Sequence, residues 1–174
     1  MTPINSKLIH FPSDRTIGFV YESRQHSDAD RKWTYVGPAR GTVVLQMGRK
    51  VLLEIALLAA RSPMVPVNVS NYLDPLLSLR NDDVDGLKLE GLGSQLTDAE
   101  LRFIQQFDGL ELLDLRGTAY AGEIDGSLAR FRNLHELNLS GTLITNRTFA
   151  RIGQIPFKRE ICLDVMSVTR VSSM

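Results

Sequence analysis

The sequence lacks several features that would indicate a particular class of protein. It has a single cysteine, so no disulfide can form within the chain. The 20 Lys and Arg residues are balanced by 20 Asp and Glu residues, and without a strongly basic surface we expect no nucleic acid partner. No stretch approaches about 18 uninterrupted apolar residues, so we expect no membrane span. The first residues lack the basic-then-apolar order of a signal peptide, and we expect a cytoplasmic location.

The common motifs of catalysis and cofactor binding are also missing. No P-loop, dinucleotide-binding glycine fingerprint, G-x-S-x-G or H-E-x-x-H motif occurs. His10, His26 and His135 do not have metal-ligand spacing. Cys162 could act as a nucleophile only beside a base that lowers its pKa, and we favour the alternative of an ordinary thiol. We therefore predict that the chain is not an enzyme and that it has no cofactor and no metal site.

The second half of the chain contains leucines at a recurring spacing. The segments VDGLKLEGLGS, LELLDLRGTAY and LHELNLSGTLIT repeat every 24 to 26 residues, and PFKREICLDV is a degenerate fourth copy. Leucines two positions apart point to the same face of a short strand, and the leading apolar residue enters the same core. The period predicts parallel strands, one per copy, whose inward positions align. These positions are Leu87 and Leu89, Leu113 and Leu115, Leu137 and Leu139, and Ile161 and Leu163.

The segments LHELNLSGTLIT and LELLDLRGT resemble bacterial leucine-rich repeat proteins of the L-x-x-L-x-L-S-G-T-x-I-T type. The resemblance covers residues 84–155 well and 156–166 weakly. It implies an α/β solenoid, a short leucine-rich repeat with three or four parallel strands and short outer helices. Such families often have asparagine where this chain has Thr118, Thr142 and, in the first copy, Leu92. We expect each threonine hydroxyl to bond the turn backbone of the neighbouring copy, and we expect the first turn to differ in shape.

The first half of the chain has a different pattern. Residues 17–56 are rich in β-branched and aromatic residues and predict a small antiparallel sheet of three or four strands. The segment MGRK, with Gly48, predicts a hairpin turn within it. Because a solenoid needs an end cap, we expect this sheet to cover the first repeat. The expected division is a β-rich N-terminal cap region over 1–80 and leucine-rich repeats with a C-terminal edge over 81–174, in one continuous folding unit.

Short helices are expected outside the strands. Their predicted N-caps are Thr97 or Asp98 and Thr145 or Asn146, because these side chains can accept hydrogen bonds from the first turn. A further helix is predicted from about Tyr72 to Leu79.

The strand residues between the leucines form the candidate binding surface, because the strand face is the usual binding surface of the proteins that the chain resembles. An outward Leu112 supports binding, since that position has no predicted core role. The alternative is that opposite charges such as Lys88–Asp114 and Glu90–Arg116 only keep this surface soluble and the strands in register. The residues predicted to contact a partner are Leu112, Asp114, Arg116, His135, Glu136 and Asn138.

The predicted function is a non-catalytic protein–protein interaction module or adaptor that presents the strand face. Residues 81–174 contain 10 basic and 14 acidic side chains, which is compatible with a basic partner protein. The alternative is an accessory or regulatory subunit that binds through the N-terminal β cap, around Trp33 and Tyr35, or through the C-terminal sheet edge. The edge segment 160–168 could also accept a strand from a second copy, so self-association is a further expectation.

Overall fold

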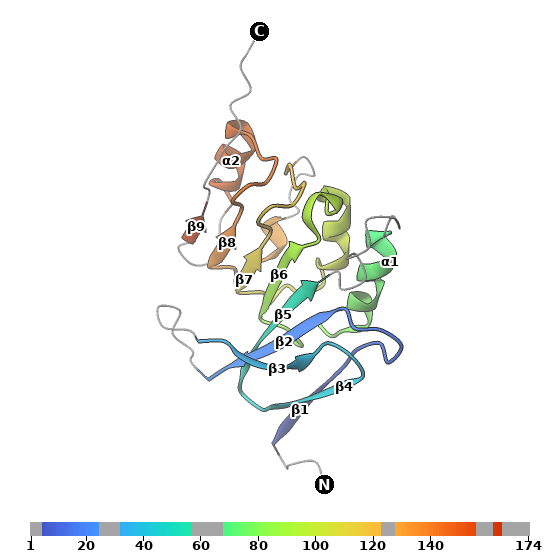
Figure 1. Cartoon of the computed structure of the whole chain (residues 1–174). Coiled ribbons are helices and arrows are strands. Elements are labelled where there is room, and N and C mark those ends of the chain that lie inside the picture. The colour runs from blue at the N-terminus through green and yellow to red at the C-terminus, as the bar shows by residue number, and fades with distance from the viewer. Residues whose placement is uncertain (1–4, 25–31, 57–67, 123–127, 156–161, 165–174) are drawn as a thin grey trace.

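The computed structural model describes residues 5–24, 32–56, 68–122 and 128–155, together with the strand at 162–164. These residues form two sheets (Figure 1). One has seven strands in the order β3-β2-β5-β6-β7-β8-β9, and the other pairs β1 with β4. The strands are β1 (Ser6–His10), β2 (Gly18–Ser23), β3 (Thr34–Pro38), β4 (Thr42–Gln46), β5 (Lys50–Ala56), β6 (Gly86–Gly91), β7 (Leu112–Asp114), β8 (Glu136–Asn138) and β9 (Cys162–Asp164).

The seven-stranded sheet is mixed. Its strand β2 pairs antiparallel with both β3 and β5, whereas β5 pairs parallel with β6. All neighbours from β5 to β9 are parallel. Leu87, Leu113 and Leu137 are Cα partners in successive strands, which is the register that the leucine spacing predicted. In the fourth copy the predicted register is wrong by two residues, because the partner of Leu137 is Leu163 and not Ile161.

Most helices between the strands are short 3₁₀ helices. The N-cap predicted at Thr97 is confirmed, because its hydroxyl accepts from the Ala99 N–H at 3.3 Å and Glu100 accepts from the Thr97 N–H at 3.0 Å. Thr145 is likewise the N-cap of the last helix. The helix predicted from Tyr72 begins earlier, behind the side-chain cap of Asn68. The helices are α1 (Val69–Leu73), η3 (Asp74–Ser78), η4 (Gly93–Gln95), η5 (Asp98–Phe103), η6 (Leu128–Arg130) and α2 (Asn146–Ile152).

A single hydrophobic cluster connects both sheets with the helices. The seven-stranded sheet contributes Leu53 of β5, Leu87 of β6 and Leu113 of β7. Ile9 of β1 joins them from the two-stranded sheet. Tyr72 and Leu101 bring α1 and η5 into the same cluster, and Ile152 brings in α2. The core thus lies on one side of the parallel strands. None of the described helices has the length and apolar character that a membrane crossing needs.

The prediction of an α/β solenoid of three or four parallel strands behind a separate antiparallel β cap is wrong. β5, which belongs to the predicted cap, pairs with β6 of the first predicted repeat, so strands from both halves form one mixed sheet. The helices are few and short. The leucine period begins only at Val84, and backbone N–H and C=O groups pair with any strand of suitable position. The period therefore could not reveal where the sheet begins. The chain is a small domain built on a mixed sheet.

Two further details of the N-terminal half differ from expectation. Gly48 does form a turn, with φ of +77°, but no hairpin results, because β4 pairs with β1 and β5 pairs with β2. β1 itself was not predicted from the sequence. Two consecutive strands that separate into different sheets leave no signal in a local pattern, since the turn between them has the same residues in either case.

Candidate functional site

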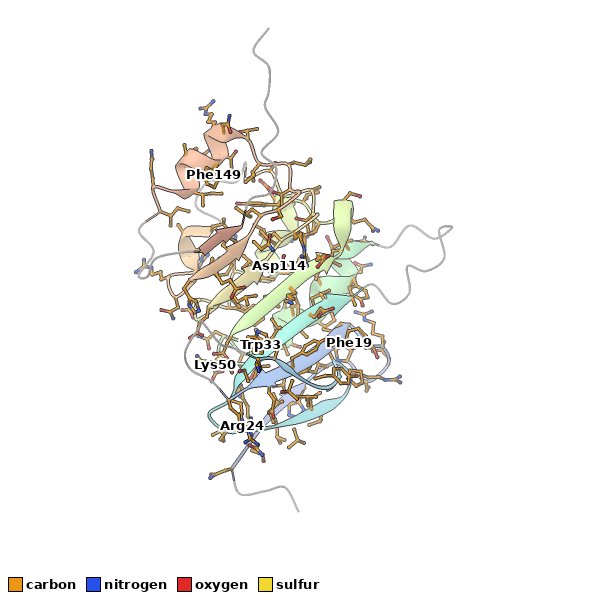
Figure 2. The ribbon with its side chains drawn as sticks, turned by 60° about the vertical axis from the view of Figure 1, so that its left-hand side comes forward. Phe19, Arg24, Trp33, Lys50, Asp114 and Phe149 are labelled. Atoms are coloured by element: carbon orange, nitrogen blue, oxygen red, sulfur yellow. The ribbon has the colours of Figure 1, made fainter. Side chains whose placement is uncertain are left out.

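The side chains that point away from the hydrophobic cluster form a continuous surface on the seven-stranded sheet. Alternate residues of a strand point to opposite faces, and the Cα register therefore places this surface on the side opposite Leu53 and Leu87. Figure 2 labels Phe19, Lys50 and Asp114, which come from the strands β2, β5 and β7 of this sheet. We call the surface the open face and define it by Phe19, Tyr21, Tyr35, Leu52, Glu54, Gly86, Lys88, Glu90, Leu112, Asp114, Arg116, Glu136 and Asn138.

Three aromatic side chains occupy the antiparallel end of the open face. The ring of Tyr35 meets Phe19 edge-on at a centroid distance of 6.1 Å and Tyr21 at 5.7 Å. Both are favourable aromatic geometries. Tyr35 nevertheless remains 55% exposed. The pKa of Tyr21 is raised by burial, then by the charge of Glu54 and a hydrogen bond to it, and then by Tyr35. Phe19 and Tyr21 thus hold the ring of Tyr35 in place, and Tyr35 stays open to solvent.

An apolar pair lies in the middle of the open face. Leu52 and Leu112 border the space above Gly86, where an added Cβ would lie 2.9 Å from Leu52 Cδ1 and 3.4 Å from Leu112 Cβ. Leu112 is only 4% exposed, and it does not belong to the main cluster. The prediction that Leu112 is an outward contact residue is therefore wrong as to its accessibility. Gly86 leaves room that the two leucines fill, and little of their surface is left for a partner.

Asp114 and Asn138 are Cα partners on β7 and β8, and each side chain accepts a hydrogen bond from the backbone two residues later. Asp114 Oδ1 accepts from the Arg116 N–H at 2.9 Å, and Asn138 Oδ1 accepts from the Ser140 N–H at 3.0 Å. These are Asx-type turns that end the strands. Asp114 is buried, which limits direct contact with a partner.

Arg116 is one of the exposed charged groups among the predicted contacts. Its guanidinium pairs with the Glu90 carboxylate and lies 3.8 Å from Asp114 Oδ2. The pair of Arg116 and Glu90 is the one that the sequence predicted, and both side chains are exposed. Glu136 is also exposed on the same face.

His135 is not part of the open face. It precedes β8 and is 7% exposed, and its backbone N–H donates to the Glu111 carbonyl at 3.0 Å. Its ring Nδ1 lies 3.3 Å from the Asn133 carbonyl. The prediction that His135 contacts a partner is therefore wrong. Residues two apart along a strand point to the same side, so His135 lies on the side of Leu137 and away from the open face.

The threonines after the strands behave as expected in part. The Thr118 hydroxyl donates to the Leu115 carbonyl and the Thr142 hydroxyl to the Leu139 carbonyl, each at 2.7 Å. The bonds stay within one turn and do not reach the neighbouring turn. The first turn does differ in shape: Leu92 is followed by the 3₁₀ helix η4, whose Gly93 has φ of +51°.

An ion-pair cluster at the end of the open face was not predicted from the sequence. Lys50 Nζ lies 2.9 Å from Asp85 Oδ1 and 2.7 Å from Glu111 Oε1. Asp85 Oδ2 also accepts from the Val51 N–H at 2.8 Å. Burial lowers the pKa of Lys50, but hydrogen bonds and charges from Glu111 and Asp85 outweigh it, so the pKa is raised. The cluster ties β5 to the segments that lead into β6 and β7.

The structure therefore brings four of the six predicted contacts together on β7 and β8. Arg116 lies two residues beyond the end of β7, and His135 lies outside the open face. The aromatic cluster was not included in the predicted site. Its signal was present, because Phe19 and Tyr21, like Trp33 and Tyr35, are two residues apart and so share a strand face. What the sequence did not provide was the pairing of β2 with β5, which puts these aromatics on the same sheet as the leucine strands.

Within the described ranges, no three His, Cys, Asp or Glu side chains are grouped as a metal site would need. The side chain of Cys162 lies outside the described residues. Two cavities, of about 590 and 540 Å³, lie away from the open face. Comparison of the chain with family models, curated proteins and solved structures finds no match. The resemblance to leucine-rich repeat proteins therefore stays a prediction based on its residues.

Proposed function

We propose that this chain is a non-catalytic protein-binding module that docks a partner protein on the open face. The observation that carries the proposal is the exposed ring of Tyr35, which Phe19 and Tyr21 support and which lies on the same sheet face as the exposed Arg116–Glu90 pair. A firmly held aromatic side chain surrounded by polar groups is typical of the residues that dominate binding energy at protein interfaces. The cavities of about 590 and 540 Å³ are lined by residues outside the open face.

The charges of the open face favour a basic partner segment. Its acidic side chains are Glu54, Glu90, Asp114 and Glu136, and its basic side chains are Lys88 and Arg116. A basic side chain of the partner would gain from this acidic balance and from the exposed face of Tyr35, since arginine and lysine are attracted to aromatic rings. The leucine pair over Gly86 acts as a rigid support beneath this surface.

The test is an affinity capture from the native host with four forms of the chain, followed by mass spectrometry. The forms are the unaltered chain, Tyr35→Ala, Glu136→Lys and the control Leu143→Ala. Leu143 is 57% exposed and lies in the turn before α2, so it controls for loss of an exposed apolar side chain elsewhere. We expect a partner that binds the unaltered chain and the control but is depleted about tenfold or more with Tyr35→Ala and Glu136→Lys.

Thermal unfolding of each form would first establish that it is folded, because Tyr35→Ala also removes two aromatic contacts. Retention of every captured protein by both open-face variants would contradict the proposal. Loss with Tyr35→Ala alone would instead place the binding surface on β2 and β3, which is the alternative of an accessory subunit that binds through the N-terminal strands.

The proposal has two further parts, which concern self-association and location. Self-association through the C-terminal edge is compatible with the position of β9 as the last strand of the sheet, and the mass of the chain in solution would test it. A cytoplasmic location remains an expectation that is compatible with a single cysteine.

A further inference from the structure

A cavity of about 590 Å³ lies outside the open face, where β7 and β8 begin. Its walls come from the segments that lead into these two strands. Asp108, in one wall, lies two residues before Leu110. Arg132, in the other, lies two residues before Leu134, the equivalent leucine of the next copy of the pattern. The described residues that line the cavity are Asp108, Ala129, Arg130, Arg132 and Asn133.

Buried side chains and turns hold the arginine wall of the cavity in place. Phe131 and Leu134 are fully buried, and the residues between them, Arg132 and Asn133, are exposed. The Leu134 N–H donates to the Phe131 carbonyl at 3.0 Å. The Arg132 N–H donates to the Arg130 carbonyl at 2.9 Å. The backbone that carries the two arginines is thus ordered in advance, which lowers the entropic cost of binding a ligand there.

The two arginines provide accessible positive charge. Arg130 and Arg132 are exposed, and no ion pair or hydrogen bond of either guanidinium is found within the described residues. The carboxylate of Asp108 accepts from the Asn81 side chain at 3.4 Å, on the side of the preceding segment. The cavity therefore has two unpaired guanidinium groups and one carboxylate. Guanidinium groups bind phosphate through parallel pairs of N–H donors, so this pair suits a phosphate group.

The other polar groups of the cavity suit hydroxyl groups. A carboxylate such as that of Asp108 repels a bare phosphate ion but accepts hydrogen bonds from hydroxyls. The Asn133 amide can donate and accept, and no hydrogen bond of this side chain is found in the described part of the chain. The cavity volume is within the range of about 300–1,000 Å³ that is typical of small-molecule sites. A small molecule with both phosphate and hydroxyl groups therefore matches the cavity better than an inorganic anion does.

We infer that this cavity is a binding site for a small phosphate monoester that also has hydroxyl groups, such as a sugar phosphate. Arg130 and Arg132 bind the phosphate. Asp108 and Asn133 bind the hydroxyl groups. The cavity shares no described residue with the open face, so the ligand and the partner protein bind at separate sites. Either proposal can fail without affecting the other.

The test is isothermal titration calorimetry of the whole chain at low salt. The probe is ribose phosphorylated on its terminal hydroxyl, called ribose phosphate below, and it is compared with inorganic phosphate and with ribose. Arg130→Gln and Arg132→Gln each remove one guanidinium. Arg147→Gln is the matched control, because Arg147 is also exposed and no side-chain partner is found for it among the described residues. Thermal unfolding would establish that each variant is folded, as expected for substitutions at exposed positions.

We expect ribose phosphate to bind more tightly than inorganic phosphate, and ribose to bind too weakly to measure. Arg130→Gln and Arg132→Gln should each weaken the binding of ribose phosphate about tenfold or more, whereas Arg147→Gln should leave it unchanged. Equal weakening by all three variants would show a nonspecific effect of charge and would overturn the inference. Absence of ribose phosphate binding, or inorganic phosphate that binds as tightly, would also overturn it.

Asp108→Ala provides a second readout, which separates the two halves of the ligand. The substitution removes a negative charge from the cavity, which favours inorganic phosphate, and it removes an acceptor for the hydroxyl groups of ribose phosphate. The preference for ribose phosphate over inorganic phosphate should therefore fall about tenfold, as loss of a hydrogen bond to a charged group would give. An unchanged preference would overturn the assignment of a ligand with hydroxyl groups.

Discussion

At the scale of single residues, two glycines allow strands to approach where a side chain would not fit. A Cβ on Gly18 of β2 would lie 2.0 Å from the Glu54 carbonyl oxygen of β5, and one on Gly91 would lie 2.5 Å from the Ile55 carbonyl oxygen. Both contacts are with backbone atoms, which cannot rotate away. These glycines therefore allow β5 to have neighbours on both sides, which is the junction between the antiparallel and parallel parts of the sheet.

We expect Gly18→Ala to lower the free energy of unfolding by about 1–3 kcal/mol, as overpacking of a core does. Gly37→Ala is the matched control on the neighbouring strand β3, because a Cβ there would meet nothing within 4 Å. Its effect should stay within about 1 kcal/mol, since a compatible glycine-to-alanine change mainly restricts the unfolded chain. Urea unfolding of the two variants would measure both. Equal stability of Gly18→Ala and Gly37→Ala would show that β2 does not approach β5 as closely as described.

Asp114 and Asn138 were predicted as partner contacts, but in the structure their side chains stabilise the turns that follow β7 and β8. Strand alternation places both residues on the open face. In both, a side-chain oxygen accepts a hydrogen bond from the N–H two residues later. A carboxylate and an amide therefore accept the same turn hydrogen bond in neighbouring strands. The charge of Asp114 is not required for the turn, and its closeness to Arg116 is a secondary contact at 3.8 Å.

At the scale of elements, the Lys50 cluster joins β5 to the two segments that lead into β6 and β7. The ammonium group is shared by two carboxylates from these segments, and all three side chains are at most 23% exposed. A charged group that bonds two carboxylates away from bulk water contributes more than a surface ion pair does. The cluster therefore helps to hold the antiparallel and parallel parts of the sheet together.

We expect Lys50→Met to lower the free energy of unfolding by about 1.5–3 kcal/mol, because it leaves Asp85 and Glu111 close together without their shared donor. Lys88→Met is the matched control on β6: Lys88 is also half-buried, and no ion pair is found for it within the described residues. Its effect should stay within about 0.5 kcal/mol. Chemical denaturation at neutral pH would compare them, and similar losses for both variants would contradict a special role for Lys50.

The leucine strands could be predicted from the sequence because their signal repeats. Each copy places leucines at the same offsets, so the period alone aligned Leu87, Leu113 and Leu137 in neighbouring strands. The partner strand β5 could not be found in this way. Its sequence KVLLEIA has apolar residues on both faces and no counterpart in the repeat, so nothing local distinguishes an antiparallel partner from a parallel one. The resulting mixed sheet overturned the expected fold.

The candidate site was predicted with similar limits. Strand alternation correctly put Asp114, Glu136 and Asn138 on one face, because side-chain direction follows directly from position in a strand. Burial was not predictable, since it depends on neighbours: Leu112 is buried because Gly86 lies beside it, and Leu52 approaches from β5. The aromatic cluster required the pairing of β2 with β5, which is a contact distant in sequence.

At the scale of the whole molecule, the charge of the open face follows that of the second half of the sequence, which supplies most of its charged side chains. The open face has four acidic and two basic side chains. The same asymmetry runs along the chain, because residues 1–80 contain 10 basic and 6 acidic side chains and residues 81–174 contain 10 and 14. A basic partner segment would gain from this acidic balance, and salt should weaken the interaction.

Stability at alkaline pH tests the packing of the whole sheet, because the two groups with raised pKa values on this side both belong to β2 and β5. Burial, with the charge of Glu54, raises the pKa of Tyr21. Glu111 and Asp85 raise the pKa of Lys50 against the opposing effect of burial. A group whose folded pKa lies above its unfolded value stabilises the fold fully below the unfolded pKa. This contribution is lost as the pH rises through the folded pKa.

Since unfolded tyrosine and lysine titrate near pH 10, the free energy of unfolding should stay level from about pH 7 to 9 and fall above about pH 10. Urea unfolding across this range would measure the fall for the unaltered chain and for the double variant Tyr21→Phe, Lys50→Met. The variant should be less stable at neutral pH but lose less stability on passing to alkaline pH. Parallel curves would mean that neither group is coupled to folding, and the hydrogen bonds of Tyr21 with Glu54 and of Lys50 with its two carboxylates would then not form in solution.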